Sequence, residues 1–546
     1  MSLSSTLRDQ AFRWIADDPD PDTKAELQRV VASAMGGVPG AVEDLADRMN
    51  GTLSFGTAGL RGPVRAGSNG MNRAVVIRAT AGVAEWLRHK GHAGGTVVVG
   101  RDARHGSASF MEAAAGVLSA AGFSVLTMPG PLPTPITAFL VRSLGAVAGI
   151  QITASHNPPA DNGYKVYTDD GSQIVPPDDR LIEAGIRGAA AARSVPVSPG
   201  AVPVASSQVA SYLTHVASLP RGSARELRVV LTPMHGVGGD TALEALRLAG
   251  FTDVTLVPAQ AEPDPDFPTV DFPNPEEPGA ASLLLSLAAS SDADLAIALD
   301  PDADRCALGV RFADGWRMLR GDETGALLGA HVLSTLDRAV HPDPLVASTI
   351  VSSSLLARVA AAAGARHAET LTGFKWLVRA GDGLVFAYEE ALGLCVDPSS
   401  VRDKDGISAS ILACDLAATL KVAGRSVPAA LDDLAVAHGV HLTDQVSLRF
   451  TDVAAIGPLV AALRASPPTS LGGAEVSQDN PAPDIIRLRA EGLRVVIRPS
   501  GTEPKVKAYL EVVEPVASPE ALVSARAKAS DRMTSLRDEI AALLKA

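Results

Sequence analysis

Aromatic residues, cysteines and long apolar runs are all scarce in this chain. Aromatic side chains make up 4% of the 546 residues, which argues against a surface that stacks carbohydrate rings or single-stranded nucleic acid. The three cysteines are far apart and form no C-x-x-C motif, which argues against a disulfide framework and a zinc cluster. No apolar run approaches the ~18 residues of a membrane span, and charged residues follow the first methionine too closely for a signal peptide. We therefore expect a soluble, cytoplasmic protein with no membrane partner.

Positive charge is also in deficit. Lysine and arginine total 48 against 61 aspartate and glutamate residues, a net charge of −13. Such a chain has no global attraction for nucleic acid, so we expect no nucleic-acid partner, and any anionic ligand needs a local basic site. Hydrophobic residues make up 46% of the chain, enough to bury several cores and to exclude general disorder.

Short apolar runs alternate with helical segments over most of the chain, which predicts an α/β fold. The runs TVVVG (96–100), AVAGIQI (146–152) and DLAIALD (294–300) are spaced by alanine-rich helical stretches, as in βαβ units whose sheets are covered on both faces. After about residue 440 the pattern indicates a mostly antiparallel sheet with helices at 453–465 and 518–545. We predict three consecutive α/β domains with mixed sheets plus a C-terminal α+β domain, over residues 1–205, 206–320, 321–440 and 441–546.

A serine follows one of these strands directly. The segment TASHNP (153–158) places the Ser155 hydroxyl at the carboxyl end of a parallel-type strand, where open α/β sheets bind ligands. No G-x-S-x-G surrounds it, so a serine-hydrolase elbow is not expected. A polar turn with local backbone hydrogen bonds explains the same residues. Lys165, on the returning segment, could approach the same hydroxyl.

Three aspartates at alternate positions follow another predicted strand. Asp300, Asp302 and Asp304 repel one another unless their loop wraps around a cation, and carboxylate oxygens suit a hard divalent ion. An EF-hand is excluded because Arg305 and Arg311 stand where that loop needs glycine and glutamate. A solvated acidic turn is the alternative. Magnesium suits a site that leaves room for a phosphate oxygen.

The C-terminal segment RPSGTEPK (498–505) is rich in hydrogen-bond donors. A guanidinium, two hydroxyls, a glycine and a lysine within eight residues suit a phosphate better than an ordinary hairpin. Weaker signals lie in YEEALG (388–393), where paired acids could grip sugar hydroxyls or merely start a helix, and in Lys375, which either reaches a cleft or caps a turn. The polar stretch 397–406 is expected to be a surface loop.

Together these loops resemble the α-D-phosphohexomutase superfamily of phosphoglucomutases and phosphomannomutases. TASHNP looks like its phosphoserine loop, DPDADR (300–305) like its magnesium loop, YEEALG like its sugar-recognition loop and RPSGTEPK like its phosphate-binding loop, in the expected order. GTAGLRG (56–62) and GRDAR (100–104) also resemble first-domain segments of that family. The resemblance covers nearly the whole chain and implies four domains around a central cleft.

The resemblance also implies the reaction and the residues that perform it. Phospho-Ser155 gives its phosphoryl group to one hydroxyl of a sugar monophosphate, the bisphosphate turns around, and its other phosphate returns to Ser155. The implied cofactors are one Mg²⁺ per chain, bound by Ser155, Asp300, Asp302 and Asp304, and a hexose 1,6-bisphosphate activator. The implied catalytic residues include Arg61 and Arg305, with Lys165 as acid/base and His156 and Lys375 as rivals. The implied substrate-binding residues are Lys375, Glu389, Glu390, Arg498, Ser500, Gly501, Thr502 and Lys505.

The sugar loop departs from the common family pattern. Tyr388 replaces a leading glycine and Ala391 replaces a serine. The YEEALG form of the loop, followed by VRDKDG (401–406), looks more like that of phosphopentomutases and glucose-1,6-bisphosphate synthases. Losing a hydroxyl donor relaxes discrimination between sugars. We therefore expect interconversion of hexose 1- and 6-phosphates, with pentose phosphates or bisphosphate synthesis as the alternative. A sugar-phosphate hydrolase and a silent sensor are alternatives of other classes. The expected partners are small phosphorylated sugars, and the chain is expected to be a monomer or dimer.

Overall fold

The structure is a computed structural model that describes residues 3–545 except 54, 56–58, 451–455 and 500–504. The chain divides into two compact units. Unit 1 comprises Met1–Gly309 and Asp397–Asp415, and unit 2 comprises Val310–Val396 and Leu416–Ala546. Asp397–Asp415, which we term the return segment, thus belongs to unit 1 although both flanking segments belong to unit 2.

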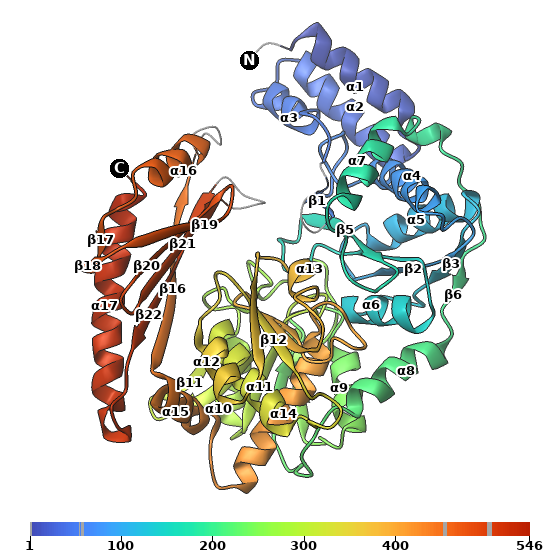
Figure 1. The fold of residues 1–546 in the computed structure, drawn as a ribbon. Coiled ribbons are helices and arrows are strands. Elements are labelled where there is room, and N and C mark those ends of the chain that lie inside the picture. The colour runs from blue at the N-terminus through green and yellow to red at the C-terminus, as the bar shows by residue number, and fades with distance from the viewer. Residues whose placement is uncertain (1–2, 54, 56–58, 451–455, 500–504, 546) are drawn as a thin grey trace. The chain divides into compact units, whose positions relative to one another are not determined.

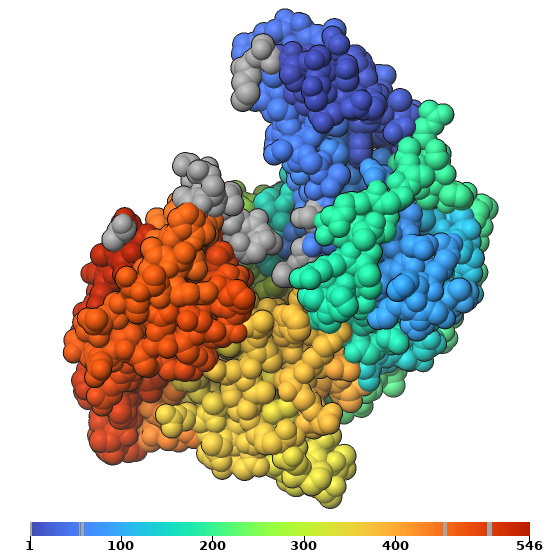
Figure 2. Space-filling view, turned by 45° about the horizontal axis from the view of Figure 1, so that its top comes forward, coloured from blue at the N-terminus to red at the C-terminus, as the bar shows by residue number. Residues whose placement is uncertain are grey.

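Unit 1 begins with three helices, α1 (Ser5–Asp17), α2 (Pro21–Met35) and α3 (Ala41–Arg48), which share a small apolar core. Local capping defines where the first two helices start, because the Ser4 and Asp20 side chains accept hydrogen bonds from backbone N–H groups of the first turn. In the space-filling view the helices form a dark blue lobe continuous with the remainder of the N-terminal region (Figure 2).

The first sheet of unit 1 holds the TASHNP loop and has the strand order β1-β5-β4-β2-β3-β6 (Figure 1). The pairs β2–β4 and β2–β3 are parallel, whereas β4–β5 and β1–β5 are antiparallel. The sheet is therefore mixed. Its strands and helices are β1 (Leu60–Pro63), α4 (Arg73–His89), β2 (Thr96–Arg101), α5 (Ser107–Ala120), β3 (Ser124–Thr127), α6 (Thr134–Ser143), β4 (Ala148–Ile152), β5 (Asp161–Thr168), α7 (Asp178–Gly188), η1 (Ala192–Ser194) and β6 (Val202–Pro203).

The second sheet holds the aspartate loop and has the order β11-β10-β9-β7-β8. Its central strands β7 and β9 are parallel and fully buried, which explains their unbroken apolar sequences. The elements of this region are α8 (Ser206–Ala217), β7 (Val229–Thr232), α9 (Gly239–Leu248), β8 (Val254–Leu256), η2 (Pro258–Gln260), α10 (Ser282–Ser290), β9 (Leu295–Leu299), β10 (Cys306–Phe312) and β11 (Gly315–Met318).

Unit 2 contains a third sheet, of order β13-β12-β14-β15, in which β12 lies parallel to both of its neighbours. Gly321 is the first residue of a largely buried helix, α11. The elements of this part of the chain are α11 (Gly321–Thr335), β12 (Leu345–Thr349), α12 (Leu355–Ala362), β13 (Arg366–Thr370), α13 (Phe374–Leu377), β14 (Leu384–Glu389), β15 (Gly393–Cys395), α14 (Gly406–Val422) and α15 (Val427–His438). Helix α14 up to Asp415 belongs to the return segment of unit 1.

The C-terminal part of unit 2 is an antiparallel sheet of order β16-β22-β21-β20-β19, with the long helix α17 packed against it (Figure 1). Alternate residues of β22 and one stripe of α17 share a core with α16. The elements are β16 (Val440–Arg449), α16 (Ile456–Ala465), β17 (Ser470–Leu471), β18 (Ala474–Glu475), β19 (Ser477–Ala482), β20 (Ile485–Ala490), β21 (Leu493–Pro499), β22 (Lys505–Glu514), η4 (Pro519–Ala521) and α17 (Leu522–Leu543).

Among the described residues, no single helix has the length and apolarity of a membrane span. Helices α14 and α15 reach that composition only when counted together across a 90° bend.

Candidate active site

Ser155 lies in the loop that follows β4, with a backbone shape that few residues adopt. Its φ is 53°, in the left-handed region, where the conformational free energy of a residue with a Cβ is higher by about 1 kcal/mol or more. A hydrogen bond from the Ser155 N–H to Thr153 Oγ1 (2.9 Å) supports the turn. The side chain is 2% exposed and donates to Asp300 Oδ2 at 2.7 Å. The nucleophile candidate and the aspartate loop are therefore in direct contact.

The three aspartates converge as their alternation suggests. Asp300, Asp302 and Asp304 are each 0% exposed, and one carboxylate oxygen from each lies within 4.8 Å of the others. The loop owes its curvature to a positive φ of 53° at Ala303 and to the Arg305 N–H, which donates to Asp300 Oδ1 at 2.9 Å. The solvated acidic turn is excluded by this burial.

The donor set fits a divalent cation. Asp302 Oδ1 and Asp304 Oδ1 are buried and accept no hydrogen bond from any described residue, although a buried carboxylate oxygen normally has a partner. Hard oxygen ligands that accept no hydrogen bond, on a curved loop, are what an ion such as Mg²⁺ binds.

Two lysines neutralise part of this charge. Lys165 Nζ lies 2.7 Å from Asp302 Oδ2 and 2.7 Å from Asp304 Oδ2, and Lys404 Nζ lies 3.3 Å from Asp304 Oδ2. Burial favours neutral Lys165, but the two carboxylates outweigh it and raise its pKa. Burial likewise opposes ionised Asp302, and Lys165 holds the pKa of that carboxyl below its ordinary value. Asp300 has its pKa raised well above the ordinary value by burial and by the other two carboxylates.

Lys404 was missed by sequence reasoning, and the expectation of a surface loop around it is wrong. Asp403 and Asp405 are 1% and 2% exposed. Asp403 accepts a hydrogen bond from Tyr167 Oη at 2.9 Å, and Asp405 accepts one from Tyr212 Oη at 2.9 Å. The only available signal was the charge density of the DKDG segment, because all of these partners are remote in sequence.

Arg61 and His156 flank the serine loop. Arg61 Nη1 donates to Asn157 Oδ1 at 3.0 Å, and His156 Nδ1 lies 3.2 Å from Ser155 Oγ. Burial and the charges of Arg305 and Arg61 hold the pKa of His156 well below its usual range, so its imidazole is neutral at pH 7. Unit 1 thus brings together the candidate residues Arg61, Ser155, His156, Lys165, Asp300, Asp302, Asp304 and Arg305.

The other candidates belong to unit 2. Glu390 follows β14 and accepts hydrogen bonds at Oε2 from Thr349 Oγ1 (3.0 Å) and Ser352 Oγ (2.9 Å). Its partial burial, with the Glu389 and Asp322 carboxylates nearby, raises its pKa to about 7. Lys375, in α13, is 5% exposed.

Arg498 is the second-to-last residue of β21, and Lys505 is the first residue of β22. Arg498 Nη1 donates to Thr372 Oγ1 at 2.6 Å, in the segment that leads into helix α13 with Lys375. The predicted ligands Ser500, Gly501 and Thr502 lie outside the described residues.

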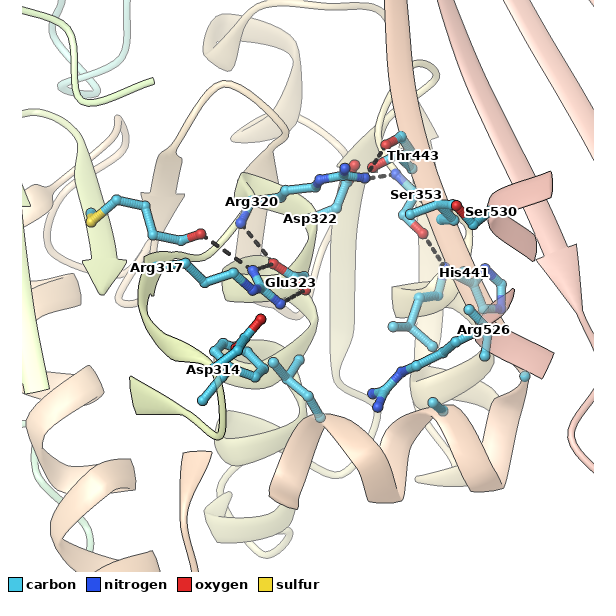
Figure 3. A pocket seen from close by; sticks show the side chains of 18 residues that line it. Asp314, Arg317, Arg320, Asp322, Glu323, Ser353, His441, Thr443, Arg526 and Ser530 are labelled. Carbon is cyan, nitrogen blue, oxygen red and sulfur yellow. Dashed lines mark hydrogen bonds and ion pairs between the residues drawn. The ribbon is translucent and has the colours of Figure 1, made fainter. Parts of the chain in front are cut away.

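Unit 2 also contains a cavity of about 580 Å³ beside the first turn of α11 (Figure 3). Arg317 forms a two-pronged ion pair with Glu323 (2.8 and 2.9 Å) on one side, while His441, Arg526 and Ser530 line the other. Arg320 donates to the Thr443 carbonyl across it. None of the predicted sugar or phosphate ligands among the described residues lines this cavity.

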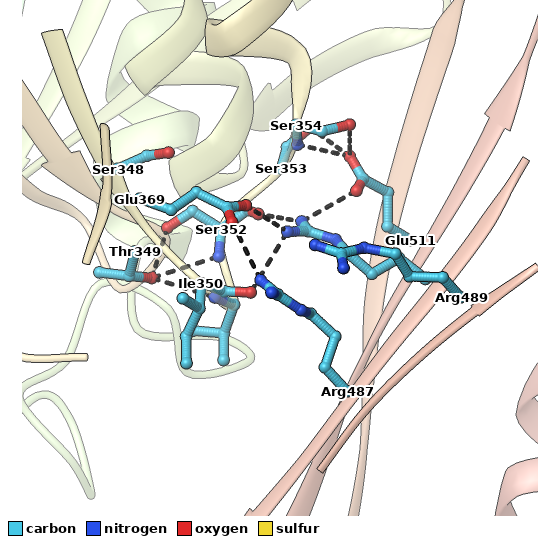
Figure 4. Close-up of polar contacts among 12 residues, drawn as sticks. Ser348, Thr349, Ile350, Ser352, Ser353, Ser354, Glu369, Arg487, Arg489 and Glu511 are labelled. Atoms are coloured by element: carbon cyan, nitrogen blue, oxygen red, sulfur yellow. Dashed lines mark hydrogen bonds and ion pairs between the residues drawn. The ribbon is translucent and has the colours of Figure 1, made fainter. Parts of the chain in front are cut away.

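An ion-pair cluster joins β22 to the loop after β12 (Figure 4). Glu511 Oε1 accepts from Ser353 Oγ (2.8 Å) and Ser354 N (2.7 Å), and its Oε2 lies 2.8 Å from Arg494 Nη2. Burial opposes this charge, but Arg494 and His441 outweigh it and lower the pKa of Glu511 to about 2.

Fold and site together define a multidomain α/β protein with a buried serine beside a carboxylate loop able to hold a metal. Models of phosphoglucomutase/phosphomannomutase α/β/α domains I, II and III match residues 52–193, 210–312 and 320–436, and the model of the C-terminal domain matches 459–529. The chain belongs to the phosphoglucomutase/phosphomannomutase family. The expected superfamily and fold class are thereby confirmed.

Relatives of the chain differ in the sugar that their names specify. A probable phosphomannomutase of Haemophilus influenzae is 40% identical over 81% of this chain and 93% of its own length. A probable phosphoribomutase of Schizosaccharomyces pombe is 34% identical over 93% of this chain and 94% of its own. The human phosphopentomutase is 33% identical over 93% and 92%. These relatives confirm the expectation of a phosphosugar mutase.

Solved structures agree on the fold. A putative phosphomannomutase from Thermus thermophilus superposes with a TM-score of 0.71 at 24% identity, over 90% of this chain and 99% of that one. Parafusin, a phosphoglucomutase from Paramecium crystallised in an open form, gives a TM-score of 0.68 at 18% identity, over 90% and 95%.

Proposed function

We propose that this protein interconverts sugar 1-phosphates and terminal sugar phosphates by way of phospho-Ser155 and a bound bisphosphate. The observation that carries the proposal is the 2.7 Å hydrogen bond between Ser155 Oγ and Asp300, within a family of phosphosugar mutases. A hydroxyl buried against three carboxylates is an unfavourable place for a structural serine, but a suitable one for a phosphoryl group held through a cation.

Asp300, Asp302, Asp304 and an oxygen of phospho-Ser155 would hold one Mg²⁺. When bound, the ion neutralises charge on the transferring phosphoryl group. Arg305, whose backbone N–H donates to Asp300, and Arg61, which donates to Asn157, add positive charge near the serine loop.

Proton transfer to and from the sugar hydroxyl is assigned to Lys165. Its ammonium lies within the carboxylate loop at 2.7 Å from two aspartates, so it is held where the hydroxyl would meet the phosphoryl group. His156 remains a rival because its neutral ring lies 3.2 Å from Ser155 Oγ, and Lys375 is a second rival.

The sugar and its second phosphate are assigned to unit 2. Glu389 and Glu390 would accept hydrogen bonds from adjacent sugar hydroxyls, with Glu390 oriented by Thr349 and Ser352. The phosphate that is not being transferred would be bound by a cationic, hydroxyl-rich set: Lys375, Arg498, Ser500, Gly501, Thr502 and Lys505.

We favour hexose 1- and 6-phosphates as substrates, with hexose 1,6-bisphosphate as activator, in a cytoplasmic monomer or dimer. Relatives named for mannose support this choice, while those named for ribose or pentose support the alternative. The alternative also has a structural argument: Tyr388 is 0% exposed and donates to Asp322 Oδ1 at 2.9 Å, so it offers the sugar no hydroxyl.

The test is the Ser155→Ala variant together with a substrate panel. We expect the variant to lose multiple turnover, by at least about 10⁴-fold, and to incorporate no radiolabelled phosphate from hexose 1,6-bisphosphate. Near-normal turnover would overturn the phosphoserine assignment.

A substrate panel assayed with the wild type ranks the sugars: it contains glucose, mannose, glucosamine, ribose and deoxyribose 1-phosphates. Pentose turnover well above hexose turnover would reverse our choice, and inorganic phosphate release as fast as isomer formation would indicate a hydrolase.

Metal removal provides an independent test. We expect chelation by EDTA to abolish turnover and added Mg²⁺ to restore it, because two of the three buried carboxylates otherwise have an oxygen without a hydrogen-bond partner. Full activity after exhaustive chelation would contradict the metal assignment.

A further inference from the structure

Arg104 is a buried arginine whose two terminal guanidinium nitrogens both donate hydrogen bonds to the backbone of the serine loop. It lies between β2 and α5 and is 4% exposed. Its Nη2 donates to the Ser155 carbonyl (2.7 Å) and the Asn157 carbonyl (2.6 Å). Its Nη1 donates to the carbonyls of Pro158 (2.8 Å) and Asp161 (3.2 Å). One side chain therefore ties together both ends of the loop that carries the nucleophile.

Arg104 is itself held from two directions. Asp102 Oδ2 lies 3.4 Å from its Nε, and Asp102 is fixed in turn at Oδ1 by the Arg104 N–H (3.0 Å) and Ser107 Oγ (2.6 Å). The Phe267 ring lies 4.9 Å from the guanidinium carbon, within the range of a cation–π contact. Both supports belong to unit 1, so the guanidinium has a defined place before any ligand binds.

We propose that Arg104 is a positioning residue that holds the Ser155 loop in its reactive shape. This inference rests on the proposed function. Ser155 has a positive φ of 53°, and a strained residue keeps such a shape only where its surroundings impose it. The bond from Nη2 to the Ser155 carbonyl fixes the peptide next to the strained torsion, and with it the direction of Oγ toward Asp300.

The chemistry requires arginine in particular. Four carbonyl oxygens accept from two nitrogen atoms of a planar fork, and an ammonium group presents only three hydrogens from a single point. A lysine would keep the positive charge but leave some of the four carbonyls, among them the buried carbonyl of Ser155, without a donor. Arg104→Lys therefore separates the geometric role of this residue from its charge.

The experiment compares wild type, Arg104→Lys, Arg104→Ala and the control Arg142→Lys. Arg142 also donates to backbone carbonyls, those of Asp170 and Ser399, in the same unit, but it does not contact the serine loop. We expect Arg104→Lys to lower kcat, and the rate of phosphoryl transfer from hexose 1,6-bisphosphate to Ser155, by about 100-fold. KM should change by less than about threefold, because no substrate contact is lost. Guanidinium ion should partly restore the activity of Arg104→Ala.

Hydrogen exchange provides a readout independent of the reaction. Peptides covering residues 153–161 should exchange faster in Arg104→Lys than in wild type or Arg142→Lys. Unchanged kcat and unchanged exchange in Arg104→Lys overturn the proposal. If the loop exchanges faster in Arg104→Lys but Ser155 of the wild type is never phosphorylated, the loop-positioning role is supported and only the mutase assignment is overturned. If neither Arg104 variant folds, Asp102→Asn replaces them, and in that variant wild-type kcat with wild-type loop exchange overturns the proposal.

Discussion

Burial changes the acid–base behaviour of individual side chains in both units. His156 is kept neutral by burial and nearby arginines, whereas the pKa of Glu390 is raised to about 7 by partial burial and two neighbouring carboxylates. A residue of the proposed sugar site thus changes charge near neutral pH. This follows from local environment, because isolated glutamate titrates well below neutrality.

We expect kcat/KM to fall roughly tenfold from pH 8 to pH 6 through Glu390 alone, because only its ionised form accepts sugar hydroxyls at full strength. Glu390→Gln should lack this component. The comparison of wild type with the variant removes the titration of the substrate phosphate itself, which has a pKa near ~6. In the companion variant Glu389→Gln the midpoint should move to lower pH, because one source of repulsion is gone. Identical pH profiles for wild type and Glu390→Gln would refute the assignment.

At the scale of elements, the return segment supports the aspartate loop. The Gly406 N–H donates to the Ala303 carbonyl at 3.1 Å. A Cβ at Gly406 would lie 2.5 Å from the Arg305 carbonyl and 2.8 Å from that of Ala303. The start of α14 therefore has room only for glycine, and it limits where the carboxylates can lie.

Gly406→Ala should displace the aspartate loop, lower kcat by up to about 100-fold and raise the Mg²⁺ concentration needed for half-maximal activity. Gly188→Ala is the matched control, because a Cβ there meets nothing within 4 Å. Titration of activity with Mg²⁺ checks both variants. A Gly406→Ala enzyme with the metal dependence of wild type would show that the loop tolerates the shift.

Strand β22 carries the clearest acid-sensitive contact. The pKa of Glu511 is lowered to about 2, so its stabilising effect is complete above the unfolded pKa near ~4.5 and is lost as the pH falls toward 2. At pH 7, Glu511→Gln should lower the free energy of unfolding of unit 2 by about 3–5 kcal/mol, because Arg494 loses its buried partner. At pH 3 the difference between wild type and the variant should shrink.

Urea denaturation of wild type, Glu511→Gln and the exposed control Glu475→Gln at the two pH values measures this difference. Equal unfolding midpoints for wild type and Glu511→Gln at pH 7 would contradict it.

At the scale of the whole molecule, the two units share the chain in an interleaved order. The chain passes between them after Gly309, Val396 and Asp415, so no single cut separates them. The return segment supplies unit 1 with Asp403, Asp405 and Asp415, each of which accepts hydrogen bonds from residues before 309. Unit 1 is therefore incomplete as a continuous fragment.

A chain ending at Gly309 should unfold about 10 °C or more below unit 1 of the full protein, because it loses several buried hydrogen bonds of roughly 1 kcal/mol each and the packing around them. A synthetic peptide of residues 397–415 should raise the melting temperature of this fragment. Calorimetry measures both. A fragment as stable as unit 1 in the full chain, and indifferent to the peptide, would show that the return segment contributes no stability.

The sequence by itself determined the order and chemistry of the loops. Ser155, the three aspartates and the donor-rich segment at 498–505 each follow an apolar strand, and strand periodicity is a local property that can be read without a structure. A fully apolar run predicts a buried strand, and open α/β sheets bind ligands at the carboxyl ends of such strands. The serine and aspartate loops could therefore be identified from the sequence as candidate sites.

Only the tertiary structure decided which charged residues support those loops. Lys404 and Asp403 look like a solvated turn, yet Asp403 is buried against Tyr167, 236 residues earlier. The positioning role proposed for Arg104 likewise depends on four carbonyl groups that only the folded chain brings around its guanidinium. The physical reason is that the burial and pairing of a charge depend on partners brought together by folding, and no local pattern records a neighbour so far away along the chain.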